Sequence, residues 1–440
     1  MNGDALTEWL RLDAHPLAGE DPEDVSDTAL APVLDIIGDS RVVALGESMH
    51  RTHEFPAWRR RLFRFLVENA GFSAMVIESG FPEGALVDRW VSSGTGSLRR
   101  ALTEGITYHF GKCQEALDLV VWMREHNATA VAPLHFYGMD IPDSAASPLP
   151  ALTTVADALD GMDPAYAEHL RRTLIAAHDF LPSDRSGLAR AAPAIHSYLA
   201  LDAPRRHAIT AGIAALVERL RARRTDYLAD GAEADTVDHM IRVAETARGA
   251  DAFLSAMLDG ATRTWPAANI RDLTMADTVQ WILEREKRIL VFGANGHVRK
   301  TSYLAPPFVT QPLATVGTHL HARLGDDYTV IGTTFGEGEV WLHSPSPDDL
   351  PGHSTPFLQE LGTLRPESLD AHLAGSGLGA FLVDLRRASP AASAILDRVH
   401  GTHNGPELEP ADIRRSFDAV LHVERVSPWH TWIDERGRWS

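Results

Sequence analysis

The sequence predicts an α/β fold in which helices flank a central, mainly parallel sheet. Three short apolar runs, at residues 42–45, 74–77 and 134–137, are each followed closely by an acidic residue. Amphipathic helical patterns separate these runs, and strands that alternate with helices pair in parallel through right-handed crossovers. A long stretch without strand signals then interrupts the alternation, so we also expect a large helical insertion; periodicity leaves open whether it lines a deep cleft or only enlarges the fold.

Composition is typical of a globular protein with a sizeable core. The 440 residues are 44% hydrophobic and carry a formal net charge of -19 at pH 7. Nucleic acids and anionic membranes need clustered positive charge on a partner, so we expect neither to bind here. A small molecule is the expected partner, and the oligomeric state stays open.

Cysteine content and the N-terminal segment predict a cytoplasmic protein. Cys113 is the single cysteine, which excludes an intrachain disulfide and a cysteine-based zinc site. The first residues lack a basic segment followed by a long apolar one, and no run of about 20 apolar residues occurs anywhere. We therefore expect neither export nor membrane anchoring.

The segment before Ser40 is acidic and interrupted by prolines. Short helical patterns at residues 6–12 and 28–37 are its only regular elements. We expect it to form a surface lead-in to the first strand.

The first three strands carry acidic residues to one place. Expected strands and helices alternate at residues 42–45, 72–78, 85–90, 115–127 and 134–137. Glu47, Glu78 and Asp140 follow the three strands, and the carboxyl ends of parallel strands meet at one edge of a sheet, where ligands bind.

The chain divides into three parts by its secondary-structure pattern. Residues 1–148 are expected to form the N-terminal part of the α/β core, and residues 149–262 the helical insertion. Residues 263–440 form the expected C-terminal part of the core. Strand patterns return there at residues 288–292, 328–335, 380–385 and 419–423.

The helix after the first strand has an apolar stripe that contains one arginine. Its apolar residues recur at helical spacing, at Phe55, Trp58, Leu62, Phe63, Phe65 and Leu66. At about 100° per residue, Arg59 lies within roughly 40° of Phe55, whereas Arg60, Arg61 and Arg64 lie outside the stripe and are expected to be solvated. Because a buried charge needs compensation, Arg59 is expected to face a carboxylate or a substrate. A structural ion pair with Glu47 or Glu78 is the equally open alternative.

Two familiar catalytic motifs are poorly matched. Ser48 has a preceding glycine, as in a nucleophile elbow, but His50 stands where the closing glycine belongs. The glycines at 375, 377 and 379 precede a strand instead of following one, which disfavours dinucleotide binding. No cofactor is expected.

The strongest candidate site combines Glu47, His50, Arg59, Glu78 and His297. A histidine that acts as a general base needs a carboxylate that fixes its tautomer and stabilises its protonated form. Two histidines with carboxylates also suit zinc or iron, so metal binding stays the alternative to acid-base catalysis.

Several segments, taken together and in order, resemble the erythromycin esterase family. They are the Tyr108-His109-Phe110 stretch and VVALGESMHRTHEF, VIESGFPEG, FYGMDIP, RDLTMADTVQW and FGANGHVRK, within about residues 34 to 335. The resemblance implies a metal-independent hydrolase that opens a macrolide lactone with water, without a covalent acyl-enzyme, and so a link to antibiotic resistance.

The resemblance also implies roles for individual residues. His50 matches the general base, with Glu47, Arg59 and Glu78 as its partners, and His297 matches the second histidine of a His-Asn-Ala-His motif. Tyr108, His109 and Asp140, from neighbouring motifs, are the expected substrate-binding residues. No metal ligand is implied.

Ala294 departs from the family pattern, which has histidine at this position. The loss of a functional acid or base typically lowers a rate by about 10²- to 10⁴-fold. One alternative to hydrolysis is therefore a biosynthetic enzyme that uses His50 as a base for elimination, cyclisation or group transfer on a natural product. Another is a non-catalytic binder of a natural product, such as an immunity or sequestration protein.

Overall fold

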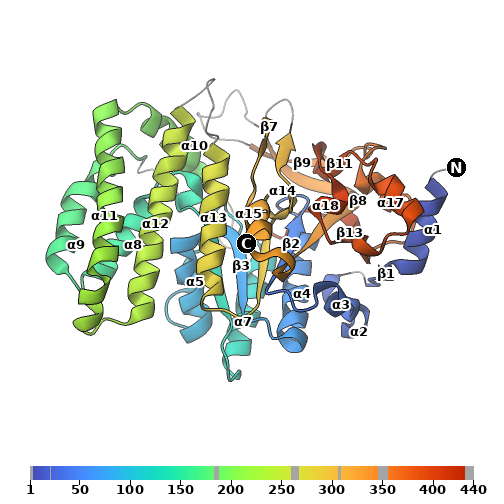
Figure 1. Cartoon of the computed structure of the whole chain (residues 1–440), viewed down its shortest axis with the longest axis horizontal. Helices are drawn as coiled ribbons and strands as arrows, with labels where there is room; N and C mark the ends of the chain where they lie inside the picture. Colours follow the sequence, from blue (N-terminus) through green and yellow to red (C-terminus); the bar gives the residue numbers. More distant parts are fainter. Residues whose placement is uncertain are drawn as a thin grey trace.

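The structure is a computed structural model that describes residues 3–19, 21–182, 188–258, 267–305, 309–344 and 355–431. A sheet runs through the middle of the molecule, with a block of long helices at one end and the C-terminal elements at the other (Figure 1). Among the described residues every helix is too short or too polar to cross a lipid bilayer.

The central sheet is mixed and mostly parallel, as the sequence predicts. Its strands lie in the order β1 (His15–Pro16), β10 (Phe381–Asp384), β13 (Ala419–Val426), β8 (Tyr328–Ser344), β2 (Val42–Glu47), β5 (Ile289–Ala294), β3 (Ala74–Gly80) and β4 (His135–Asp140), and β9 (Thr355–Glu360) pairs with β8. The strands from β13 to β4 pair in parallel, whereas β1, β10 and β9 pair antiparallel.

Helices cover both faces of the sheet. Because successive strand residues point to opposite faces, each strand supplies apolar side chains to both layers. Val43 and Leu45 of β2 pack with α4 (Glu54–Ala70), α5 (Phe81–Ser93) and α7 (Gln114–Asn127) on one face. Val42 and Ala44 pack with α1 (Gly3–Asp13), α13 (Ala267–Leu283), α15 (Val316–Leu324), α16 (Leu369–Ala374) and α17 (Pro390–Leu396) on the other.

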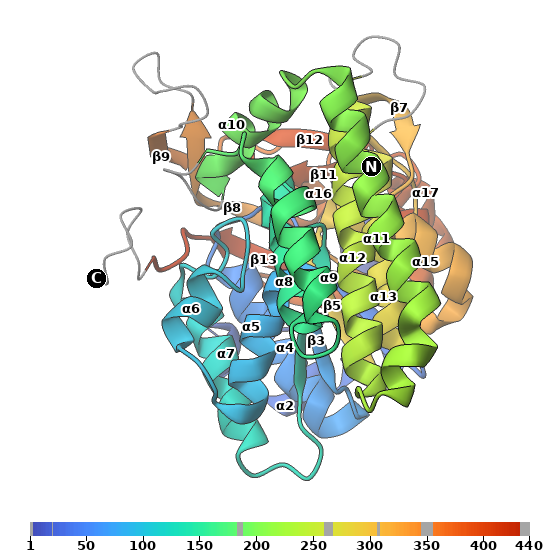
Figure 2. The same ribbon diagram turned by 90° about the vertical axis from the view of Figure 1, so that its left-hand side faces the viewer.

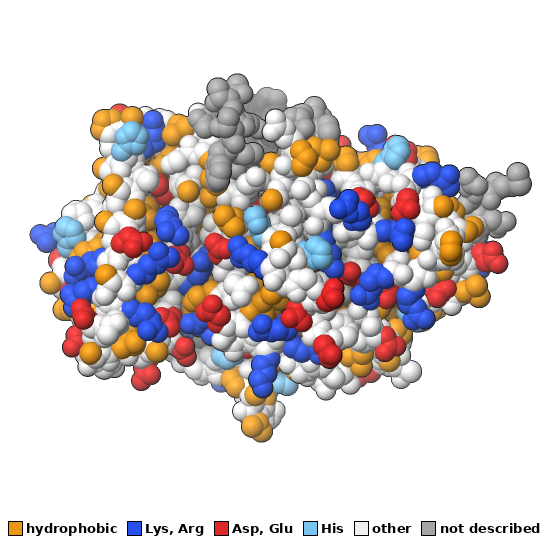
Figure 3. Space-filling view, in the orientation of Figure 1, with side chains coloured by type: hydrophobic (Ala, Val, Ile, Leu, Met, Phe, Trp, Pro, Cys, Tyr) orange, Lys and Arg blue, Asp and Glu red, His pale blue; other side chains and the backbone are white. Residues whose placement is uncertain are grey.

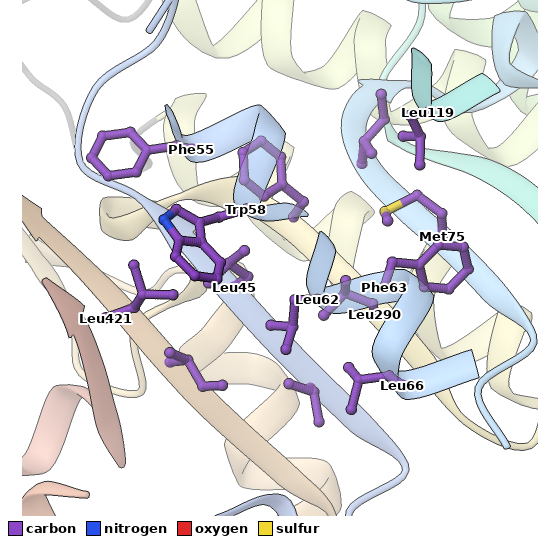
Figure 4. Packing of buried hydrophobic residues seen from close by; sticks show 14 of the residues in the cluster. Leu45, Phe55, Trp58, Leu62, Phe63, Leu66, Met75, Leu119, Leu290 and Leu421 are labelled. Carbon is purple, nitrogen blue, oxygen red and sulfur yellow. The ribbon is translucent and has the colours of Figure 1, made fainter. Parts of the chain in front are cut away.

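The apolar stripe of α4 forms much of the first layer. Figure 4 shows Phe55, Trp58 and Leu62 packed over Leu45 and Leu290 of the sheet. Each such side chain contributes about 1.5–3 kcal/mol when it is fully buried, so this contact fixes α4, and with it the segment that precedes α4, on the sheet.

The helical insertion follows β4 and has a core of its own. It comprises α8 (Leu149–Leu159), α9 (Pro164–Leu170), α10 (Leu188–Leu199), α11 (Ala203–Ala229) and α12 (Ala234–Ala256), with short 3-10 and π turns after α9. These helices stack beside α5 and α13 at one end of the sheet (Figures 1 and 2). Phe81 of α5 and Trp281 of α13 join the insertion to the rest, because their ring centroids lie 5.2 and 6.0 Å from that of His239 in α12. The division at residue 262 lies outside the described residues, and the three-part division stays a prediction.

Small elements complete the fold. They are α2 (Asp27–Leu30), α3 (Pro32–Ile37), α6 (Leu98–Thr103), α14 (Asn295–Val298), α18 (Ile413–Ser416), β6 (Tyr303–Ala305), β7 (Val309–Leu313), β11 (Gly401–Asn404) and β12 (Glu407–Pro410). On the face seen in Figure 3, arginines and carboxylates are interspersed over the described surface.

The expectation of a surface lead-in before Ser40 is wrong. Leu6, Trp9 and Leu10 of α1 are buried in the second layer, and the segment that contains Val25 packs against α4. The N-terminal segment also makes a second expectation wrong. Arg61 is expected in solvent, but its side chain is 1% exposed. Its guanidinium donates to the Val25 carbonyl at 2.9 and 2.7 Å, because the N-terminal segment lies over a helix face that periodicity alone assigns to solvent.

The two other arginines expected in solvent are partly covered by the same segment. Arg60 and Arg64 are 24% and 34% exposed, and both donate to the carboxylate of Glu23, at 2.9 and 3.0 Å.

Candidate functional site

The carboxyl ends of four neighbouring parallel strands form the candidate site. In the order β2, β5, β3 and β4 they present Glu47, Ala294, Glu78 and Asp140. Glu47 and Ala294 are direct partners in the register of β2 and β5. The structure thus places the three expected acids along one edge of the sheet, as the strand pattern predicts.

Gly46 lets the loop after β5 pass close to β2. A Cβ atom at Gly46 would lie 1.9 Å from the Asn295 Oδ1 atom. Asn295, the first residue of α14, is buried and connects the end of β5 to β8, because it accepts from the Thr333 amide at 3.1 Å and donates to the Thr333 carbonyl at 2.8 Å. Ser48 donates to the same carbonyl and accepts from Asn295, which ties its hydroxyl into the core and disfavours a nucleophilic role, as the sequence predicts.

His50 and Glu47 form a hydrogen-bonded pair. The His50 Nδ1 atom lies 2.7 Å from the Glu47 Oε2 atom, and the Phe110 ring lies 4.8 Å from the imidazole. A carboxylate only accepts, so the neutral imidazole has its proton on Nδ1 and an acceptor lone pair on Nε2. Burial disfavours the charged imidazole, but the Glu47 carboxylate, through its charge and its hydrogen bond, and then Glu78 together raise the pKa of His50 above its ordinary value.

His297 and Asp272 form a second pair. The His297 Nδ1 atom lies 2.8 Å from the Asp272 Oδ1 atom, and its Nε2 atom lies 3.4 Å from the Glu78 Oε1 atom. Burial opposes protonation, but Asp272 and then Glu78 overcome it and raise the pKa of His297 to about 9. At neutral pH this imidazole is therefore a cation.

Arg271 ties Glu78 to Asp140 beneath the two histidines. Its Nη2 atom donates to Glu78 at 2.9 Å and to Asp140 at 2.6 Å. Burial alone would raise the pKa of Glu78, but His297, Arg271 and then His50 lower it to about 2. The Tyr108 hydroxyl donates to Asp140 at 2.8 Å, and Asp140 has no exposed surface.

Both histidine pairs face one cavity of about 270 Å³. Its lining includes polar groups from distant segments and the Ala294 side chain, namely Glu47, His50, Asp272, Ala294, His297, Tyr303, His403, Asn404 and Glu409. Among the residues that the structure describes, none from 149–258 contributes to this lining. The role of the helical insertion as a cleft wall therefore stays a prediction.

Arg59 is buried, as the helix periodicity predicts, with 5% exposure. It lines a small cavity of about 20 Å³ together with Glu47 and Glu78, and its guanidinium lies 4.7 Å from the centroid of the Phe292 ring. The Nε atom has no hydrogen-bond partner, and no ion pair with Glu47 or Glu78 forms among the described residues. The alternative of a structural ion pair is thus not what this geometry shows.

Metal binding at this edge has little support from donor geometry. His50 and His297 each hydrogen-bond a carboxylate through Nδ1, but in the described residues their ligand atoms do not converge with a third one. In the described part of the chain, the one trio whose ligand atoms converge is His53, Glu115 and His430, away from these pairs.

The sequence singles out Tyr108 and His109 but misses Arg271 and Asp272. Tyr108 and His109 have φ angles of 58° and 64°, and neither lines the two cavities described here. Arg271 and Asp272 begin the RDLTMADTVQW segment, whose resemblance to the family is the only signal that marks them.

Comparison with known proteins supports one family. The sequence profile of erythromycin esterase matches residues 67–426. Erythromycin esterase type II of Escherichia coli is 28% identical over 433 residues, which cover 96% of this chain and 97% of that protein.

Two solved structures share the fold. A protein from Bacillus cereus superposes with a TM-score of 0.78 at 22% identity, covering 98% of this chain and 99% of its own. An erythromycin esterase mutant in its open conformation superposes with a TM-score of 0.74 at 18% identity, covering 92% and 95%. These two likenesses concern the fold, whereas the profile match, which spans most of the sequence, shows that the chain belongs to the erythromycin esterase family.

Proposed function

We propose that this protein is an ester hydrolase that uses water to open a lactone of a macrolide or a similar natural product. The observation that supports this most is that His50 with Glu47, and His297 with Asp272, face the same cavity. One pair suits a proton acceptor and the other a proton donor, which ester hydrolysis needs. Family membership supports the class of substrate.

The first step is the attack of water on the ester carbonyl carbon. His50 accepts a proton from water at Nε2, and Glu47 stabilises the imidazolium that forms. The water oxygen becomes bonded to the carbonyl carbon, whose oxygen takes the negative charge. No group on the protein becomes acylated, which fits the engaged hydroxyl of Ser48.

The second step is the departure of the alkoxide. The carbon–oxygen bond of the lactone breaks, and His297, a cation at neutral pH with a pKa of about 9, gives its proton to the leaving oxygen. His50 then releases its proton to solvent, and His297 takes one up. Arg59, a buried guanidinium beside Glu47 and Glu78, supplies positive potential to the anionic intermediate.

Asp140 and Tyr108 act here as positioning residues in place of the substrate contacts expected from the sequence. Asp140 accepts from Arg271, which in turn donates to Glu78 and orients it. Tyr108 donates to Asp140, and its ring centroid lies 5.4 Å from the Arg271 guanidinium. His109 stays a predicted substrate contact.

The test is incubation with a panel of macrolides, followed by mass spectrometry. We expect at least one product that is heavier by one water, and its formation should fall by at least about 10²-fold in His50→Asn. His400→Asn, a change at an exposed histidine, is the matched control. No hydrated product from any macrolide contradicts the substrate class, and a fully active His50→Asn contradicts the mechanism.

Ala294 favours a second candidate, a non-hydrolytic biosynthetic enzyme on the same fold. Ala294 lines the cavity at the position where the resemblance implies an imidazole, so water there would have one polar partner fewer. Products of unchanged or water-depleted mass would identify such an enzyme. Tight binding without turnover, unaffected by His50→Asn, would instead identify a non-catalytic binder.

A further inference from the structure

A second cluster of histidines and a carboxylate lies outside the proposed catalytic pairs. His53 immediately precedes α4, Glu115 is in the first turn of α7, and His430 belongs to the C-terminal segment. One ligand atom from each residue lies within 4.8 Å of the other two. The proposed reaction uses none of the three.

The two imidazoles converge on one carboxylate oxygen. The His53 Nδ1 and His430 Nδ1 atoms lie 2.7 and 2.8 Å from the Glu115 Oε1 atom, and the ring centroids are 4.6 Å apart. Three ligands around one metal ion would bring two nitrogens and an oxygen together in the same way. Without the ion, the Nδ1 protons occupy the space between these atoms.

The carboxylate of Glu115 has coordinating capacity to spare. The residue is 4% exposed, and no N–H or O–H group in the described part of the chain donates to its buried Oε2 atom. The Cys113 thiol beside this carboxylate is only a weak donor, so a cation would compensate the buried charge better.

His53 also has the outer partner that metal-bound histidines have. Its Nε2 atom lies 3.1 Å from the Asp21 Oδ2 atom, so the ring can donate outward to a carboxylate while Nδ1 faces inward. Such a carboxylate fixes the orientation of the ring and raises the basicity of the nitrogen that binds metal.

We propose that His53, Glu115 and His430 bind one zinc-like divalent ion. Two imidazole nitrogens and a carboxylate suit the borderline-soft ions of this class, and they leave a fourth position for water. Harder ions such as calcium and magnesium prefer sites built of oxygen ligands.

The ion would fasten the C-terminal segment to the two helices that flank the catalytic edge. Backbone contacts already dock this segment, because the His53 amide donates to the Ser427 carbonyl at 2.8 Å and the Gln114 amide to the His430 carbonyl at 2.7 Å. Trp429, between these contacts, lines the small cavity that contains Arg59. The proposed metal site is therefore structural, and it holds the C-terminal segment beside the catalytic residues.

Zinc binding to the full-length protein tests the proposal. After treatment with a chelator and its removal, titration with zinc chloride alone should show one equivalent bound and a raised Tm. His430→Ala should weaken zinc binding by at least about 100-fold, because it removes one of three ligands. Asp21→Asn should weaken it by about 10- to 100-fold through the loss of an outer carboxylate.

The controls separate loss of a ligand from loss of structure. The His430 side chain is 64% exposed, so His430→Ala should fold and unfold as the metal-free wild-type protein does. His400→Ala, at another exposed histidine, should bind zinc with unchanged affinity. The proposal is overturned if the wild-type protein binds no zinc, or if folded His430→Ala binds it as tightly as wild type. Neither result affects the proposed hydrolysis, which involves other residues.

Discussion

The charge of His297 depends on Asp272, and Asp272→Asn tests this dependence. The rise of the His297 pKa from 6.5 to about 9 corresponds to about 3 kcal/mol, at about 1.4 kcal/mol per unit. The His297 side chain is 22% exposed, so solvent screening takes little from this value. Because the pKa is raised in the folded protein, the stabilisation is fully present below pH 6.5 and is lost as the pH rises through about 9.

Asparagine at position 272 removes the charge and keeps the acceptor. The Asp272 Oδ1 atom accepts from His297 and from the Val316 amide, both at 2.8 Å, and the amide oxygen of asparagine replaces it in both bonds. In this variant Glu78 is the main group left to stabilise the charged form of His297 against the effect of burial. The pKa of His297 should therefore fall well below 9. At pH 7, where wild-type His297 is charged, we expect Asp272→Asn to lower the free energy of unfolding by about 3 kcal/mol. Near pH 10, where His297 is neutral, we expect a loss of about 1 kcal/mol, because hydrogen bonds to a neutral acceptor are weaker than those to a charged one.

Urea unfolding of both proteins between about pH 6 and pH 10 measures this difference, and NMR titration of the histidine ring protons gives the pKa directly. Other groups titrate in this range, but they are common to both proteins and cancel in the difference. Asp277→Asn is the matched control on the same helix, because Asp277 is 44% exposed and pairs with Arg323 on the surface. Parallel stability curves for Asp272→Asn and wild type, with an unchanged pKa of His297, would refute the reasoning.

Three further predictions concern activity and stability. If hydrolysis is found, kcat/KM should rise with pH through the raised pKa of His50 and fall again near 9, as His297 loses its proton; a flat profile over this range contradicts the assigned roles. Arg271→Met should lower the free energy of unfolding by about 3–5 kcal/mol in urea titrations, since two buried carboxylates lose their cation; a loss below about 1 kcal/mol counts against the cluster. Arg61→Met should cost about 1–3 kcal/mol in the same assay, because a buried carbonyl loses its donor, whereas Arg64→Met, at a partly exposed pair, should cost at most about 1 kcal/mol; equal losses contradict the burial of Arg61.

Local sequence patterns predict the elements of this fold well. A strand or an amphipathic helix is visible in its own residues, because side chains repeat with a period of two or 3.6. The burial of Arg59 follows from that periodicity. The error at Arg61 has the same origin, since periodicity describes one layer and says nothing of a second segment that covers the helix from outside.

Contacts between distant segments are the part that periodicity leaves open. Asp272 contacts His297, 25 residues later in the chain, and Arg271 contacts Asp140, 131 residues earlier. His430 reaches Glu115 from still farther away. Each of these side chains looks like an ordinary surface group in its own segment.

The sequence by itself determined the parallel strands, their shared edge and the presence there of Glu47, Glu78 and Asp140, because these follow from short-range pattern and chain order. Only the tertiary structure decided which charge neutralises which. It paired His50 with Glu47 and His297 with Asp272, which influences the pKa of each imidazole, and among the described residues it left Arg59 without an ion pair to Glu47 or Glu78. The physical reason is that pKa values and buried charges depend on distances of a few ångströms between segments that sequence order does not fix.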